Sequence, residues 1–99
     1  RLAFAYWEAF NSYDADKTLA YLAEPYRKQR EETIRSQLRQ IRLFRVKLGL
    51  TEETVPIFTA PDHAEMMLTM KEPLGTRRIK MQFLREGGTW LITLAEEVK

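Results

Sequence analysis

The stretch IKMQFLREGGTWLITL, residues 79–94, decides the fold of this chain. On each side of its centre, apolar residues alternate with polar ones, which is typical of a strand with one buried face. Two glycines at 87–88 separate the runs, and a type I′ turn needs positive φ at both of its central positions. The stretch therefore predicts a β-hairpin, in which Trp90 faces the core together with Ile92 and Leu94.

The period of two extends upstream of this hairpin, to about Val46. Runs at 55–59 and 64–71 predict two more strands, separated by a turn at Pro61 and Asp62. We therefore expect four antiparallel strands, with one apolar face covered by helices. The predicted inward residues are Ala64, Met66, Leu68, Met70, Ile79, Met81, Phe83, Trp90, Ile92 and Leu94. None of these side chains ionises near pH 7.

Before Val46 the apolar residues recur with the period of a helix. Helices are predicted at residues 2–13, 16–23 and 27–44. Asp14 or Asp16 is expected to cap the second helix, because a carboxylate accepts the free N–H groups of a first turn. The predicted fold class is α+β, with three N-terminal helices packed on a curved four-stranded antiparallel sheet.

The length and composition are those of one globular domain, here residues 1–99. The chain has no cysteine, which excludes disulfides, thiol nucleophiles and Cys-ligated metals. It begins at Arg1 without a Met, almost inside a helical pattern, so we expect it to be a fragment of a longer chain. Net charge is only +2, but residues 27–47 contain eight basic and two acidic residues.

Two segments carry a resemblance to a known family. The run AYWEAFNSYDADKTLAYL from Ala5 to Leu22 and the hairpin FLREGGTWLI from Phe83 to Ile92 resemble the NTF2-like (cystatin-like α+β) superfamily. The order of helices and strands fits this superfamily over nearly the whole chain. The resemblance implies a curved sheet wrapped around the long helix as a cone, with an internal pocket, and it is closest to short members of unknown function.

The apolar inner face favours a non-catalytic module that binds a small apolar ligand or a protein partner. Aromatic side chains line such pockets often, and methionines adapt to varied shapes. Candidate ligand-binding residues are Tyr6, Phe10, Tyr13, Met66, Met81, Phe83 and Trp90. The sequence predicts no catalytic residue, no metal site and no cofactor.

Two other functions remain open. An enzyme of the isomerase or dehydratase type would need an acid or base in the cone, for which Asp14, Asp16, Asp62 and His63 are the candidates. Asp14 and Asp16 are more simply explained as helix caps, and Asp62 and His63 as turn residues. An anion-binding module would instead use Arg35, Arg39 and Arg42, which form a cationic flank on the third helix.

The predicted protein partner is a second copy of the chain, bound through the uncovered face of the sheet. Its uncovered face carries Met67, Leu84, Leu91 and Ala95, which suggests a two-fold homodimer through this face. No aromatic residue interleaves with the arginines, so nucleic acid is not the favoured partner. The longest apolar run, Leu2–Trp7, is too short to span a membrane. Cytoplasmic and extracytoplasmic locations both stay open.

Overall fold

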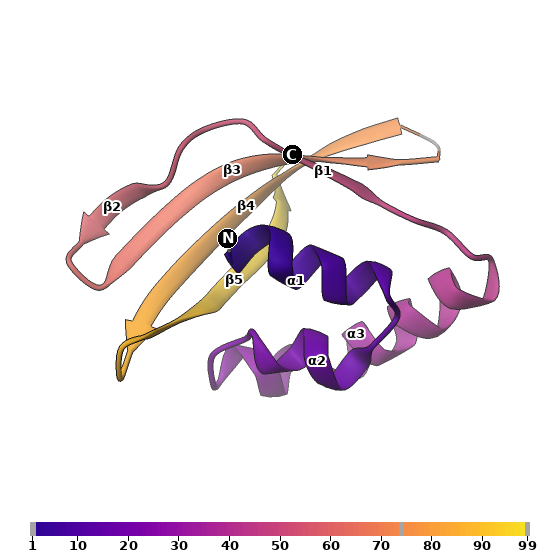
Figure 1. Ribbon diagram of the computed structural model, residues 1–99, viewed down its shortest axis with the longest axis horizontal. Helices are drawn as coiled ribbons and strands as arrows, with labels where there is room; N and C mark the ends of the chain where they lie inside the picture. Colours follow the sequence, from indigo (N-terminus) through magenta and orange to yellow (C-terminus); the bar gives the residue numbers. More distant parts are fainter. Residues whose placement is uncertain (1, 74, 99) are drawn as a thin grey trace.

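The computed structural model describes residues 2–73 and 75–98. It is an α+β fold in which three helices precede and cover one face of a curved, open antiparallel sheet (Figure 1). The helices are α1 (Leu2–Asn11), α2 (Ala15–Ala20) and α3 (Tyr26–Leu43). The strands are β1 (Gly49–Glu52), β2 (Ile57–Ala60), β3 (His63–Glu72), β4 (Gly75–Glu86) and β5 (Thr89–Val98).

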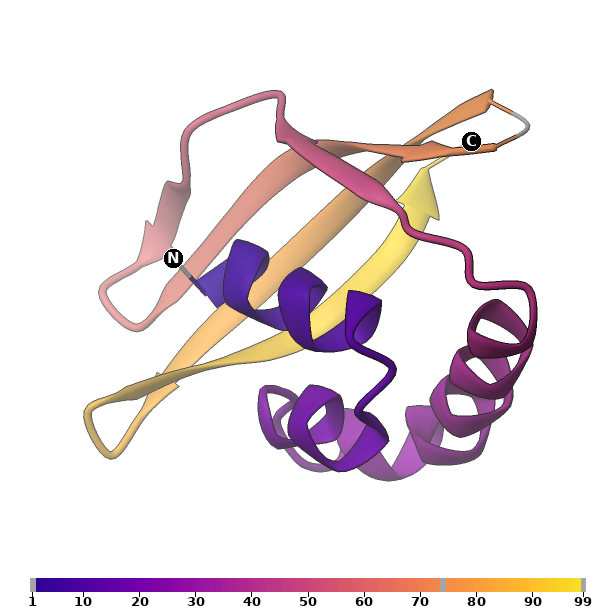
Figure 2. The same ribbon diagram turned by 45° about the vertical axis from the view of Figure 1, so that its right-hand side comes forward.

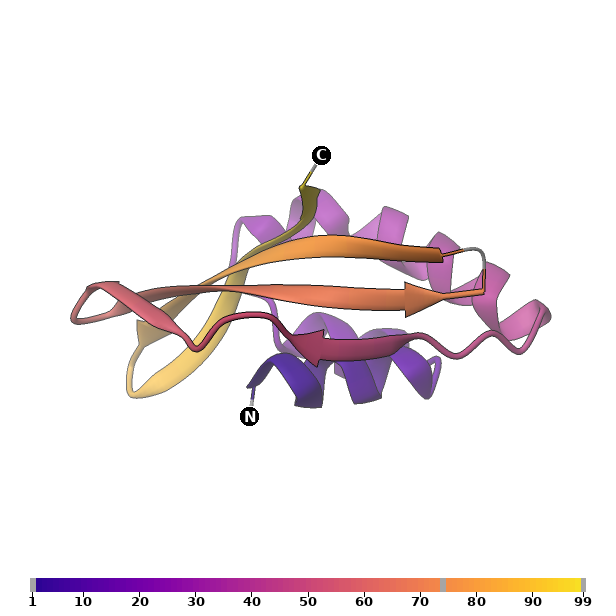
Figure 3. The same cartoon turned by 90° about the horizontal axis from the view of Figure 1, so that it is seen from above.

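The sheet has five strands rather than the predicted four, because its edge next to β3 is divided. β1 pairs with residues 68–71 of β3, and β2 pairs with residues 63–65. Pro56 lies between the two short strands, and proline cannot donate a hydrogen bond to a ladder. β1 escaped the sequence analysis because its four residues, GLTE, show no clear alternation. Figure 3 shows this interrupted edge along β3.

The end of α1 and the start of α2 are set by two neighbouring residues, Tyr13 and Asp14. α1 ends at Asn11 instead of residue 13, because Tyr13 adopts a φ of 61°, which a right-handed helix cannot accommodate. Asp14 then caps α2, and one of its carboxylate oxygens accepts the backbone N–H of Lys17 at 3.0 Å. The predicted cap is confirmed at Asp14.

The chain after α2 joins the far edge of the sheet. Leu22 forms a parallel bridge with Ile92, and the N–H of Ala23 donates to the carbonyl of Ile92 at 2.8 Å. The N–H of Ile92 donates in turn to the carbonyl of Tyr21, also at 2.8 Å. These bonds fix α2 and the start of α3 against β5, so the helical layer has a defined position over the sheet (Figure 2).

The hairpin prediction is confirmed, but the faces of β5 differ from those predicted. Gly87 and Gly88 have φ values of 58° and 80°, as the tight turn requires. A bulge then places Ile92 opposite Phe83 and Leu94 opposite Gln82, so Thr93 is the extra residue. Leu94 therefore lies on the outer face, while Ala95 packs against the core. Both assignments made from the sequence were wrong.

The core lies between α1, α3 and the concave face of the sheet. Leu68, Met81 and Ile92 are fully buried, and Ile34 and Leu38 reach them from α3. The alternation predicted for β3 and β4 holds, since Ala64, Met66, Ile79 and Phe83 are also buried. Trp90 faces inward as predicted but is only half-buried, because it lies near the open end of the sheet.

Candidate functional site

The largest hollow of the concave face, here called the inner cavity, lies between α1, α3 and the distal ends of β3, β4 and β5. Its volume is about 560 Å³, which falls in the range of small-molecule sites. The floor is formed by aromatic and aliphatic side chains, and the mouth by polar and charged ones. The residues that matter for the argument below are Tyr6, Phe10, Tyr26, Arg30, Arg77 and Glu97.

Three aromatic residues of α1 form one wall of the inner cavity. Trp7 and Phe10 stack with ring centroids 5.3 Å apart, and Tyr6 lies at 6.0 Å from Trp7. The indole N–H of Trp7 and the side-chain amide of Asn11 both donate to the carbonyl of Leu48, at 3.2 and 2.7 Å. α1 is thus tied to the connection between α3 and β1, and the aromatic wall is held in place.

Two tyrosine hydroxyls of this cavity differ in their hydrogen bonds. The hydroxyl of Tyr26 donates to the carbonyl of Ala95 at 3.0 Å and accepts from the N–H of Ala95 at 3.1 Å. The hydroxyl of Tyr6 has no hydrogen-bond partner among the residues that the structure describes, but it is open to solvent in the cavity that its side chain lines. Burial raises the pKa of Tyr6 well above its ordinary value, Tyr26 adds to the rise, and the positive charge of Arg30 opposes it. Tyr6 is therefore a neutral group with a free hydroxyl.

Charged groups surround the mouth of the inner cavity. Arg77 donates to Glu72 at 2.7 Å and to Glu97 at 2.8 Å, so its charge is balanced by two carboxylates. Arg30 lines the same cavity and forms no ion pair within residues 2–73 and 75–98. Among the described residues, the mouth therefore offers one balanced network, the exposed carboxylate of Glu96, and the guanidinium of Arg30 without a carboxylate partner.

Sequence analysis missed these charged residues, although the pattern contained them. Extending the alternation of β3 two residues past Met70 reaches Glu72, and extending that of β4 two residues before Ile79 reaches Arg77. Arg30 lies four residues before Ile34, on the same face of α3. The inner face is thus apolar at its centre and charged at its distal end.

A smaller apolar cavity of about 240 Å³ lies at the opposite end of the concave face, beside the start of α1. Met66, Phe83 and Trp90 line it, and Phe58 meets Trp90 edge to face with ring centroids 5.9 Å apart. A third hollow, the basic depression, lies beyond the end of α3. It is lined by Tyr13, Arg39, Arg42, Leu43, Arg45 and Lys47.

The predicted ligand-binding residues are therefore not gathered in one place. Tyr6 and Phe10 line the inner cavity, whereas Met66, Phe83 and Trp90 line the apolar cavity. Tyr13 lies in the basic depression, where its hydroxyl donates to the carbonyl of Val46 at 2.8 Å. Met81 is fully buried in the core and lines none of the three hollows.

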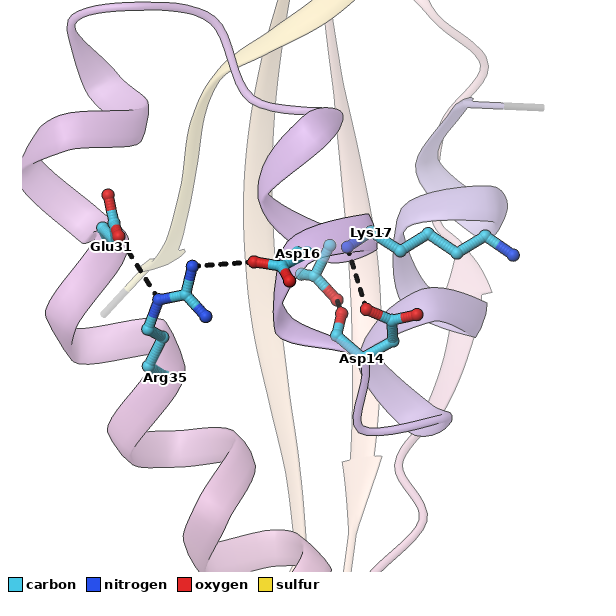
Figure 4. A network of polar contacts seen from close by, with 6 residues as sticks. Asp14, Asp16, Lys17, Glu31 and Arg35 are labelled. Atoms are coloured by element: carbon cyan, nitrogen blue, oxygen red, sulfur yellow. Dashed lines mark hydrogen bonds and ion pairs between the residues drawn. The ribbon is translucent and has the colours of Figure 1, made fainter.

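The candidate acid and base residues lie outside the inner cavity, and the two aspartates of α2 and its cap make structural contacts. Figure 4 shows Asp14 turned toward Lys17, and Asp16 facing Arg35 across the gap between α2 and α3. Arg35 donates to Asp16 at 2.8 Å and to Glu31 at 3.3 Å, and these hydrogen bonds raise its pKa. His63 is exposed at the start of β3. Asp62 pairs with Arg85, and none of the four candidates, Asp14, Asp16, Asp62 and His63, lines the inner cavity.

Within the described residues, no group of three His, Cys, Asp or Glu side chains is placed to hold a metal ion. A separate observation concerns the helices of that same part of the chain. None of them combines the length and the apolar character needed to cross a membrane.

Comparison with solved structures identifies the fold. The chain is similar to a protein from Thiobacillus denitrificans described as a calcium/calmodulin-dependent protein kinase type II association domain, with a TM-score of 0.81 and 17% identity over 97% of this chain and 90% of the other. It is also similar to an NTF2-like protein of unknown function from Shewanella oneidensis, with a TM-score of 0.74 and 14% identity over 99% and 93%.

A protein of unknown function with a cystatin-like fold from Nostoc punctiforme is similar at a TM-score of 0.70 and 16% identity, over 97% of this chain and 84% of the other. No protein-family model and no curated protein matches the sequence. The structure is thus of the NTF2-like, or cystatin-like, α+β class. At these identities the likeness concerns the fold alone, and the resemblance noted from the sequence is confirmed at that level.

Proposed function

We propose that the protein is a binding module that takes a small molecule into the inner cavity and releases it unchanged. One observation carries the proposal: Tyr6 belongs to the aromatic wall of the inner cavity, and its hydroxyl has no hydrogen-bond partner among the described residues. No fully buried side-chain nitrogen or oxygen of the described residues lacks a hydrogen-bond partner, so this hydroxyl is open to solvent in the cavity. It can therefore donate to a ligand oxygen that displaces water.

The ligand that fits is a small molecule with an apolar, preferably planar, body and an oxygen acceptor. The body would pack on Trp7 and Phe10, and the acceptor would take the proton of Tyr6 in a hydrogen bond. Turnover would need a base in reach of the ligand. Three carboxylates line the cavity: Glu72 and Glu97 are engaged by Arg77, and Glu96 is exposed to solvent. None of them is a buried base held against a ligand, which supports binding over catalysis.

The test is a ligand-observed NMR screen with planar aromatic compounds that differ only in the presence of an oxygen acceptor. Tyr6→Phe should weaken the acceptor-bearing compounds by about two- to ten-fold, the value of one net hydrogen bond, and should leave the plain hydrocarbons unaffected. Equal losses for both kinds of compound would show that Tyr6 contributes only packing.

A second variant tests the location. Gln40 is exposed at the edge of the inner cavity, so Gln40→Trp should fill the mouth and abolish binding without disturbing the core. Gln29→Trp is the matched control, because Gln29 is exposed on the same helix but does not line the cavity. Chemical conversion of any bound compound, abolished in Asp14→Asn or His63→Ala, would instead restore the enzyme hypothesis.

A further inference from the structure

The end of α3 and the segment after it form a surface that the proposed ligand site does not use. This surface, here called the cationic tip, consists of Arg39, Arg42, Leu43, Phe44, Arg45 and Lys47. It lies at one end of the long axis of the molecule, where α3 extends past the helical layer (Figure 1). It surrounds and includes the lining of the basic depression, apart from Tyr13.

Four positive charges, those of Arg39, Arg42, Arg45 and Lys47, lie close together in the cationic tip. Arg39, Arg42 and Arg45 form no ion pair in the part of the chain that the structure describes, and no carboxylate lines the basic depression. Arg35, one turn earlier on α3, differs because Asp16 and Glu31 balance it. Of the three arginines of the cationic flank noted from the sequence, Arg39 and Arg42 therefore belong to the cationic tip, and Arg35 does not.

The backbone and Lys47 give the cationic tip a defined shape. The ammonium of Lys47 lies 4.5 Å from the ring centroid of Tyr13 and donates to the carbonyl of Asn11 at 2.6 Å. The N–H of Phe44 donates to the carbonyl of Gln40 at 3.2 Å, which completes the last turn of α3. The charges are thus presented from a helix end that is tied to α1.

Two large apolar side chains project among these charges. Leu43 is 76% exposed and Phe44 is 74% exposed, whereas the inward residues of α3, Ile34 and Leu38, are each 2% exposed. Leu43 shares the basic depression with the arginines, so the apolar and cationic groups form one surface. Neither Leu43 nor Phe44 belongs to the core of the fold.

We propose that the cationic tip is a docking surface for an anionic lipid bilayer. Phosphate headgroups would meet the four basic side chains, while Leu43 and Phe44 would enter the boundary of the acyl chains. Leu43 distinguishes this partner from a nucleic acid. A base of a nucleic acid can stack on Phe44, but a phosphate backbone does not remove the apolar surface of Leu43 from water. Burial in lipid removes the apolar surface of both residues from water, which is favourable for both.

The experiment is flotation of the whole chain with vesicles of phosphatidylcholine alone and with vesicles that also contain phosphatidylglycerol. Binding is expected only to the anionic vesicles. Arg39→Gln combined with Arg42→Gln should lower the partition coefficient by about 25-fold, since each basic residue near the surface contributes about five-fold. Lys28→Gln combined with Lys80→Gln is the matched control, because it removes two positive charges away from the cationic tip.

The apolar pair gives an independent readout. Leu43→Ser combined with Phe44→Ser should weaken vesicle binding by an order of magnitude or more, while circular dichroism stays unchanged because both residues are exposed. Equal losses in the Lys28 and Lys80 control would overturn the proposal in favour of unspecific charge attraction. Binding of a single-stranded oligonucleotide that is weakened by the arginine substitutions, without any vesicle binding, would also overturn it.

Discussion

At the scale of single residues, Tyr6 links the stability of the protein to its proposed ligand site. It lies on α1 and is buried, close to Tyr26 and Arg30 of α3. The neighbouring Tyr26 has both of its hydrogen bonds fulfilled by Ala95, whereas Tyr6 has none among the described residues. A phenol in this position is useful to a ligand only while it keeps its proton.

We expect Tyr6 to keep its proton at a pH where an ordinary tyrosine, with a pKa near 10, has lost it. Burial raises the pKa of Tyr6 in the folded state. Its contribution to stability is therefore fully present below about pH 10 and is lost as the pH rises toward the folded pKa. Urea unfolding across the alkaline range should show this loss in the wild type and less of it in Tyr6→Phe. The same alkaline dependence in both proteins would contradict the expectation.

At the scale of elements, the bulge in β5 decides which side chains reach the core. Ile92 lies opposite Phe83 and is fully buried, whereas Leu94 lies opposite Gln82 on the outer face. Strict alternation would place both on the inside. The extra residue, Thr93, reverses the parity from that point onward.

This arrangement predicts unequal costs for two similar truncations. Ile92→Ala should lower the free energy of unfolding by about 2–5 kcal/mol, because it leaves a cavity in a packed core. Leu94→Ala should cost less than about 1 kcal/mol, because the removed atoms face outward. Urea denaturation of the two variants and the wild type gives both values. A Leu94→Ala cost as large as that of Ile92→Ala would mean that the bulge lies elsewhere.

At the scale of the whole molecule, the helices cover one face of the sheet and leave the other open (Figure 3). Met67, Leu84 and Leu91 lie on the open face as predicted, and Leu94 takes the place that the sequence analysis gave to Ala95. All four side chains are half-buried in the single chain. An apolar group of this kind on the uncovered face of a sheet is a common site of two-fold pairing.

We expect a homodimer through this open face, with Leu91→Glu shifting it to monomer because a carboxylate would be buried at the two-fold interface. Analytical ultracentrifugation at high micromolar concentration measures both states. Val55→Glu is the control, since Val55 is exposed and apolar but lies on the connection between β1 and β2. A wild-type monomer, or a dimer lost only in Val55→Glu, would exclude the open face as the interface.

The sequence by itself determined the class of the fold, the three helices and the final hairpin. These features depend on interactions between residues close in the chain: the period of apolar residues, the cap at Asp14, and the two glycines that permit positive φ. Helix ends were displaced by one to three residues, as at Tyr13, because end geometry depends on a single backbone conformation.

Only the tertiary structure decided where the hollows lie and which residues share them. The inner cavity joins Tyr6, Arg30, Arg77 and Glu97, which come from four separate elements. Their meeting depends on the curvature of the sheet, the register of its strands and the position of α3. A bulge at Thr93 changes that register by one residue, and the periodic pattern of the sequence does not predict it. Local sequence sets the faces of each element, but packing decides which faces meet.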